Sequence, residues 1–204
     1  MVTLNKEKRD ALSPIEALEL LKDGNHRFVT NLKLNRNLLQ QVNDTSDGQY
    51  PFAFVLSCID SRTSAELIFD QGLGDIFSCR IAGNVLNDDI LGSMEFACKV
   101  AGAKVVMVLG HTECGAIKGA CEDVKMGYLT GLLKKIRVVS KDIVKKHQGC
   151  DHNDLINLVS KENVKNVLKN IPKKSVIIKK LLKDKKIIIV GAMYDVSSGK
   201  VDFY

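Results

Sequence analysis

The sequence predicts an α/β fold in which a mainly parallel central β-sheet is flanked by helices. Short apolar runs alternate with amphipathic stretches along most of the 204 residues. The clearest run, residues 52–57, places apolar side chains on both faces of a strand, which is typical of a parallel sheet covered on both sides. Strands that alternate with helices in this way form βαβ units.

The N-terminal part is predicted to be helical. Ser13, Pro14 and Glu16 form a capping box, with the serine at the N-cap, the proline at the first helical position and the glutamate at the third. A second helical stretch is expected near Leu38–Val42. Residues 43–48 are polar and predict a loop before the first strand.

The remaining elements follow in order, with turns at glycines 72, 74, 102 and 110. The spacing of apolar residues predicts further strands at 76–79, 104–109 and 185–190. It predicts helices at 64–70, 91–101, 129–146, 155–171 and 175–182, and the polar stretch 147–154 is expected to be a loop. No internal repeat or domain boundary is evident, so residues 1–204 are expected to form one domain.

Composition excludes several classes of protein. Hydrophobic residues make up 45% of the chain, so a packed core is expected, and the net charge of +6 is mild. No apolar run is long enough to span a membrane, and residues 1–10 lack the apolar stretch of a signal peptide. We therefore expect a cytoplasmic protein, in which the six cysteines are core residues, metal ligands or reactive thiols rather than disulfides.

Two short motifs carry the chemistry. Cys58, Asp60 and Arg62 follow the first predicted strand, and His111 and Cys114 follow the third. Open α/β sheets bind ligands at the carboxyl ends of their strands. If these two strands are neighbours, Cys58, His111 and Cys114 converge on one point.

Two thiolates and one imidazole are suited to zinc, and three protein ligands leave the fourth position that a catalytic zinc requires. Arg62 can hold the Asp60 carboxylate with two parallel hydrogen bonds and keep it ionised, so that Asp60 can orient a zinc-bound water. A buried cysteine is more often a small core residue, and either motif alone is a weak signal. Two such motifs, each between a buried strand and a helix start, favour the metal site.

These motifs, together with Arg80–Asn84 and Gly110–Ala116, closely resemble the ordered signature of beta-class carbonic anhydrases. The resemblance covers the chain from about Ser13 to Asp195. It implies that Cys58, His111 and Cys114 bind one zinc ion per chain, that Asp60 and Arg62 form a catalytic dyad, and that a zinc-bound hydroxide hydrates carbon dioxide reversibly to bicarbonate. It also implies a homodimer or homotetramer, in which a helical arm formed by residues 1–45 packs on a partner subunit and residues 50–204 form the zinc-binding core.

The resemblance further implies a substrate pocket. Gln49 and Phe77 stand where one subtype of the family has its pocket Gln and Phe, and Phe96 replaces that subtype's Tyr. Ala82 and Gly83 are expected at the pocket floor. The other subtype can close its site with the aspartate on zinc, and it holds bicarbonate at an allosteric site with a Trp. Because this chain has no Trp, the open subtype is favoured.

Two other functions are compatible with the same motifs. The first is hydrolysis of carbonyl sulfide or carbon disulfide at the same zinc site, as in some relatives. The second is a zinc-stabilised module without turnover, which an intact Asp60 and Arg62 argue against. The lysines of 173–186 are interpreted as a solvated face, so neither a nucleic-acid nor a membrane partner is expected.

Overall fold

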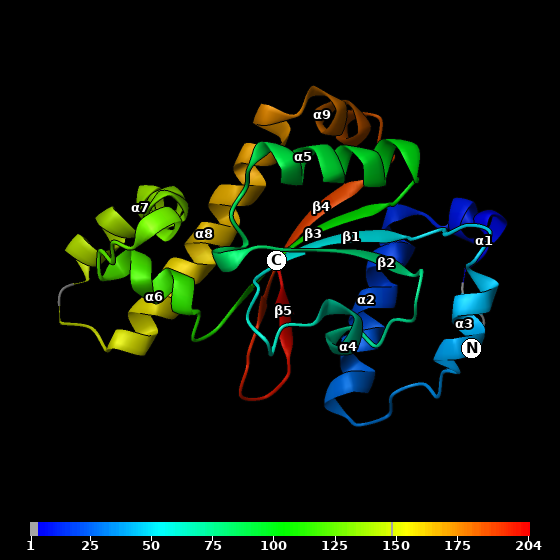
Figure 1. Cartoon of the computed structure of the whole chain (residues 1–204), viewed down its shortest axis with the longest axis horizontal. Coiled ribbons are helices and arrows are strands. Elements are labelled where there is room, and N and C mark those ends of the chain that lie inside the picture. Colours follow the sequence, from blue (N-terminus) through cyan, green and yellow to red (C-terminus); the bar gives the residue numbers. More distant parts are fainter. Residues whose placement is uncertain (1–3, 148) are drawn as a thin grey trace.

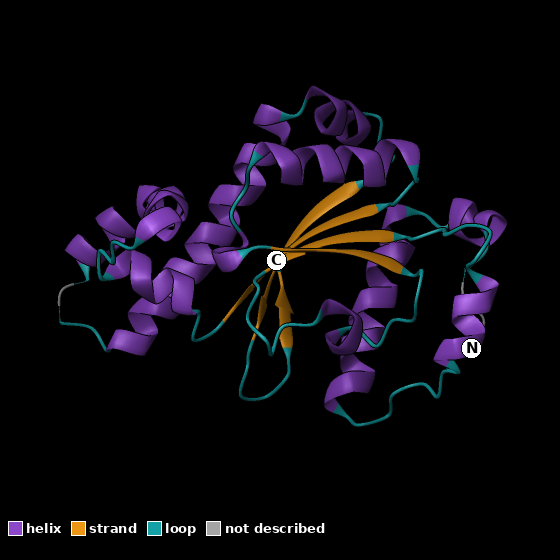
Figure 2. Ribbon diagram, in the orientation of Figure 1, coloured by secondary structure: helices purple, strands orange, loops and turns teal. Residues whose placement is uncertain are grey.

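A five-stranded sheet forms the centre of the protein (Figure 2). The computed structural model describes residues 4–147 and 149–204, and its strand order is β2-β1-β3-β4-β5. The neighbours among the first four strands are parallel, and β5 runs antiparallel to β4. The predicted mainly parallel sheet is therefore confirmed. The strands are β1 (Ala53–Ser57), β2 (Ile76–Arg80), β3 (Val105–His111), β4 (Ile188–Tyr194) and β5 (Val201–Phe203).

Helices cover both faces of the sheet and its carboxyl edge (Figure 1). One face is covered by α2 (Pro14–Val29) and α4 (Ala65–Ile68). The other is covered by α5 (Asp88–Glu95), α8 (His152–Lys174) and α9 (Val176–Lys183). Beyond the carboxyl ends of the strands lie α6 (Gly115–Cys121) and α7 (Gly127–Lys146). Two further helices, α1 (Lys6–Ala11) and α3 (Leu38–Asp44), precede β1, and two short turns of helix are η1 (Ala82–Asn84) and η2 (Phe96–Val100).

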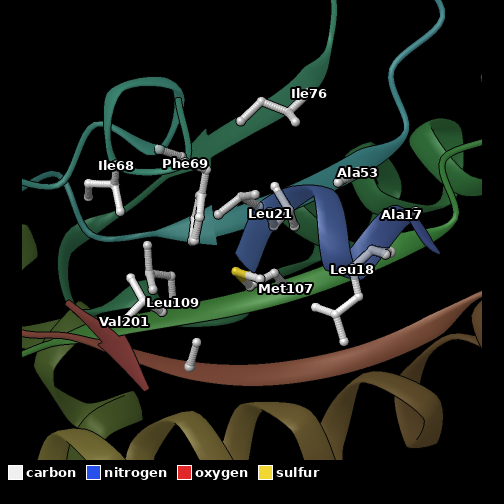
Figure 3. Close-up of a cluster of buried hydrophobic side chains, with 14 of the residues drawn as sticks. Ala17, Leu18, Leu21, Ala53, Ile68, Phe69, Ile76, Met107, Leu109 and Val201 are labelled. Atoms are coloured by element: carbon white, nitrogen blue, oxygen red, sulfur yellow. The ribbon is translucent and has the colours of Figure 1, made fainter. Parts of the chain in front are cut away.

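The alternation of side chains along β1 and β3 divides the core into two layers. Val55, Met107 and Leu109 point toward α2 and α4, where they meet Leu21 and Phe69 (Figure 3). Phe54, Leu56, Val106 and Val108 point to the opposite face, against α5, α8 and α9. Because both faces are covered, residues 53–56 of β1 and 105–109 of β3 are all apolar, as the sequence indicated.

Several element boundaries differ from the prediction. The last parallel strand begins at Ile188 rather than at 185, because Lys185 has a positive φ of 53° and turns the chain after α9. It continues to Tyr194, since its last residues pair with β3 as far as His111 and with β5. The loop expected at 147–154 is shorter, because Asp151 caps α8 through the amides of residues 153 and 154.

The helix expected at 91–101 also differs. It begins at Asp88, where Asn87 provides an N-cap, and its second half is the π-helical turn η2. Two short elements, α1 and β5, were not anticipated from the sequence. Within the described residues, no helix has both the length and the apolar character needed to cross a membrane.

A buried carboxylate attaches the N-terminal helices to the core. Asp70, with a side chain only 3% exposed, pairs with Arg27 of α2 and with Arg36 before α3. The backbone N–H of Leu34 also donates to Asp70 Oδ2, at 3.2 Å. Burial alone would raise the pKa of Asp70, but the hydrogen bonds from these donors hold it below its ordinary value.

We predict that Gly24→Ala destabilises the protein by more than about 2 kcal/mol. A Cβ at this position of α2 would overlap the carbonyl oxygen of Phe69, which belongs to the backbone and cannot swing away. Gly131→Ala in α7 is the control, because no atom lies within 4 Å of its Cβ position. That change should stabilise the protein by about 0.5–1 kcal/mol through helix propensity. Equal effects of the two changes in denaturant unfolding would contradict the close approach of α2 to α4.

We predict that Asp70→Asn lowers the free energy of unfolding at pH 7 by about 3 kcal/mol, since it leaves two arginines without their buried counter-charge. The pKa of Asp70 is lower in the folded state than its unfolded value of about 3.9, so the contribution is complete above that value. It disappears as the pH falls through the folded pKa. The difference between wild type and variant in urea titrations should therefore shrink in acid. Asp44→Asn, at an exposed position, should change neither the free energy of unfolding at pH 7 nor its dependence on pH. If the free energies of unfolding of wild type and Asp70→Asn differ by the same amount down to pH 2, the role of Asp70 is refuted.

Candidate metal centre and active site

The pairing of β1 with β3 brings the two motifs together. These strands are hydrogen-bonded neighbours in parallel register, with Leu56 opposite Val108. Cys58 lies just beyond the end of β1, and His111 is the last residue of β3. Cys114 follows three residues later, at the N-cap of α6. All three side chains thus meet at the carboxyl edge of the sheet.

The three side chains have the geometry of a metal site. Their ligand atoms lie within 4.8 Å of one another, and all three residues are buried. The two sulfur atoms of Cys58 and Cys114 are 3.9 Å apart. Two thiolates at about 2.3 Å from a tetrahedral zinc ion are separated by about 3.8 Å, so the observed spacing fits zinc.

The imidazole of His111 is fixed in the orientation that a metal requires. Its Nδ1 lies 2.8 Å from the carbonyl oxygen of Thr112, which can only accept, so Nδ1 carries the proton. The other nitrogen, Nε2, is buried and has no hydrogen-bond partner in the described structure. A buried lone pair without a partner is costly, and a metal ion satisfies it. The residues present therefore fit a zinc ion with two sulfur ligands and one nitrogen ligand.

The two thiols differ in acidity. A hydrogen bond from Cys114 lowers the pKa of Cys58, although burial opposes this, and the hydrogen bond from the backbone N–H of Gly83 lowers it further. The same close pairing raises the pKa of Cys114, and burial raises it further. The pair of thiols therefore loses its first proton easily and its second proton only with difficulty. A divalent cation supplies the charge that keeps both as thiolates.

Asp60 and Arg62 form a bidentate pair beside the cluster. Nε of Arg62 donates to Oδ1 of Asp60 at 3.0 Å, and Nη2 donates to Oδ2 at 2.9 Å. These hydrogen bonds lower the pKa of Asp60 to about 2, so the carboxylate is ionised at neutral pH. In the described structure, the metal-binding group comprises only Cys58, His111 and Cys114, so Asp60 lies outside it.

Two residues that sequence reasoning did not single out hold this loop in place. Arg80, at the end of β2, donates through Nε to the carbonyl oxygen of Cys58 at 2.9 Å and through Nη2 to that of Asp60. Thr63 Oγ1 donates to the same two carbonyl oxygens, at 3.0 and 2.9 Å. The only sequence signal for Arg80 is its place in the Arg80–Asn84 motif, and Thr63 has none.

A cavity of about 250 Å³ opens beside Cys58 and Asp60. Its other walls are mostly apolar and include Ala82, Ala116, Leu129 and Leu133. Gly83 lies behind it, with φ of +66°, and its N–H donates to Cys58 Sγ at 3.3 Å. A Cβ at Gly83 would press on Ile136 and Ala116, so only glycine fits both the conformation and the space.

The other expected pocket residues lie elsewhere in the chain. Phe77 of β2 and Phe96 of η2 pack edge to face, with ring centroids 6.2 Å apart. They line a separate cavity of about 430 Å³ between the edge strand and α5. Gln49 is exposed in the loop before β1. Within one chain, these three residues are therefore not gathered around the metal-binding group.

Comparisons with known proteins agree with this geometry. The model of the carbonic anhydrase family matches residues 53–201. A carbonic anhydrase of Mycolicibacterium smegmatis is 33% identical over 194 residues, which are 93% of each chain. Carbonic anhydrase 2 of Mycobacterium tuberculosis is 42% identical over 122 residues, 58% of each chain. Among solved structures, the beta-carbonic anhydrase CafA of Aspergillus fumigatus superposes with a TM-score of 0.75, at 27% identity over 81% of each chain.

The chain belongs to the carbonic anhydrase family, and to its beta class. Members of this family are lyases whose general reaction is the hydration of carbon dioxide, and this protein is an enzyme of that kind.

Proposed function

We propose that this protein hydrates carbon dioxide reversibly at a zinc ion held by Cys58, His111 and Cys114. The observation that carries the proposal is the buried cluster itself, with its sulfur spacing of 3.9 Å and the unpartnered His111 Nε2. When bound, zinc would lower the pKa of a coordinated water to about 7, as it does in carbonic anhydrases generally.

Asp60 orients the nucleophile in this proposal. Its carboxylate is held by Arg62 and can accept a hydrogen bond from the attacking oxygen, which fixes the direction of the remaining lone pair. Arg62 keeps Asp60 ionised, so that Asp60 accepts and does not donate. The Gly83 N–H reduces the electron density on Cys58 Sγ, which partly offsets the charge of two thiolates.

The cavity beside Cys58 is suited to a small apolar substrate. Ala82, Leu129 and Leu133 contribute apolar walls, and the small side chain of Ala82 leaves room next to the metal ligands. Moving an uncharged carbon dioxide molecule from water to such a wall costs little free energy. Bicarbonate carries a charge, so the same transfer is less favourable for it. This difference favours release of the product.

We propose that Gln49, Phe77 and Phe96 complete the active site of a second subunit. The support is their distance from the chain's own metal-binding group, together with the exposed side chain of Phe96. Since α2 packs on its own sheet, we take the exposed apolar residues of α3 as the part of the N-terminal arm that contacts a partner, although Ile15 and Leu32 are exposed as well. The α3 residues are Leu38, Leu39 and Val42, which are 55%, 73% and 50% exposed. A homodimer or a homotetramer could use this surface.

We also infer that the enzyme works in the cytoplasm. All six cysteines lie in the described residues and none is paired. Unpaired cysteines at a thiolate metal site are stable in a reducing compartment.

We predict that Asp60→Asn reduces the turnover number for carbon dioxide hydration by about 10²–10⁴-fold while zinc content stays at one per chain. The amide has the shape of the carboxylate but can no longer act as a purely accepting, charged partner. Stopped-flow hydration by metal-quantified protein measures this, with Asp142→Asn on the exposed side of α7 as the control. Undiminished turnover in Asp60→Asn would refute the role of the dyad. A zinc-loaded wild type without turnover would refute the proposed reaction and direct the search to carbonyl sulfide.

We predict that Leu39→Glu shifts the protein to a smaller species in size-exclusion chromatography with light scattering and lowers turnover in parallel. A charge at this exposed apolar site disfavours burial against another subunit. Val138→Glu, at an equally exposed apolar residue of α7, is the matched control and should change neither property. A fully active monomer would contradict the shared active site.

A further inference from the structure

Helix α8 carries no expected metal ligand, yet it presents three polar side chains to the sheet and its loops. Asn157, Ser160 and Asn163 are spaced three residues apart, so they lie along one side of the helix. Ser160 and Asn163 are each only 1% exposed. Buried polar side chains on a packing face are unusual, because apolar ones would fill the space without a desolvation cost.

Each of these side chains makes a hydrogen bond to the backbone close to a metal ligand: Ser160 and Asn157 bind the segment that carries His111 and Cys114, and Asn163 binds Gly83, which contacts Cys58. Asn163 Nδ2 donates to the carbonyl oxygen of Gly83 at 2.9 Å, and the N–H of Gly83 in turn donates to Cys58 Sγ. Ser160 Oγ donates to the carbonyl oxygen of His111 at 3.0 Å. Asn157 Oδ1 accepts from the N–H of Glu113, directly before Cys114, at 3.1 Å.

The backbone at two of these positions is in a conformation that requires support. Gly83 has φ of +66°, and Glu113 has φ of +56°, which is uncommon for a residue with a side chain. The helix can approach closely because Gly110 lacks a side chain. A Cβ there would collide with Val164 of α8 and lie 3.3 Å from Ser160 Oγ.

We propose that Asn157, Ser160 and Asn163 are positioning residues that fix the geometry of the metal-binding group from outside it. This inference rests on the proposed zinc site and deepens it. Through these bonds helix α8 holds the His111–Cys114 segment and the Gly83 turn, whose N–H contacts Cys58 Sγ, relative to one another. Their loss leaves the ligands present but poorly aligned, so that zinc is held less tightly.

The expected loss of zinc affinity is larger where the hydrogen bond that a variant removes is more deeply buried. Ser160→Ala and Asn163→Leu nearly preserve side-chain volume and remove only the donor, leaving a carbonyl oxygen in a dry environment without a partner. Each should raise the zinc dissociation constant about 10–100-fold, as is usual for groups that orient metal ligands. Asn157→Ala should have a smaller effect, since Glu113 is exposed and water can replace the amide.

The experiment is chelator competition for zinc, paired with thermal unfolding of the metal-free protein. Asn170→Ala is the matched control on the same helix, because its amide donates only to Asn166. Weaker zinc binding in Ser160→Ala and Asn163→Leu, with Asn170→Ala unchanged, is the expected result. The absorption spectrum of the cobalt-substituted protein provides a second readout, and its bands should shift in the same variants.

Two outcomes would overturn the inference alone. One is wild-type zinc affinity in both variants with a lower melting temperature of the metal-free form, which would make the bonds purely structural. The other is equal weakening in Asn170→Ala. If the wild type itself binds no zinc, the proposed function fails together with this inference.

Discussion

The parallel pairing of β1 with β3 is the constraint on which the metal-binding group depends. This pairing ends both strands at the same edge of the sheet, and it places Cys58 and His111 just where the ladder stops. A slip of one residue would turn His111 toward the opposite face, because successive side chains of a strand alternate. The close packing of both core layers opposes such a slip, since it would exchange the side chains that face α2 with those that face α8 and disrupt both layers.

The loops beyond these strands are irregular, and they are held by side chains from other elements. Arg80 of β2 and Thr63 of the loop itself bind carbonyl oxygens of the Cys58–Asp60 loop. The α8 side chains Ser160 and Asn163 bind the carbonyl oxygens of His111 and Gly83. The loops of the candidate metal site thus gain rigidity, because several of their carbonyl oxygens accept hydrogen bonds from side chains on β2 and α8.

The candidate metal site and the Phe77–Phe96 pair lie in different parts of the chain. The metal-binding group and the Asp60–Arg62 pair are assembled by one chain alone. The aromatic pair Phe77–Phe96 lies at the edge strand β2, beside a cavity between this strand and α5. If the proposed shared active site is correct, this separation makes catalysis depend on assembly, because a second subunit then brings the aromatic pair to a metal site.

The sequence by itself determined the fold class, the capped helix after Ser13 and the motifs that converge at the sheet edge. These depend on local signals, namely apolar runs, capping residues and short-range spacing. It did not determine the end of β4, the strand β5 or the roles of Arg80 and Asn163. The last residues of β4 form a strand because they pair with β3 on one side and with β5 and Tyr204 on the other. Asn163 matters only because folding brings it to Gly83, 80 residues away in the chain. Such long-range hydrogen bonds leave no periodic pattern in a single sequence, so only the tertiary structure decided them.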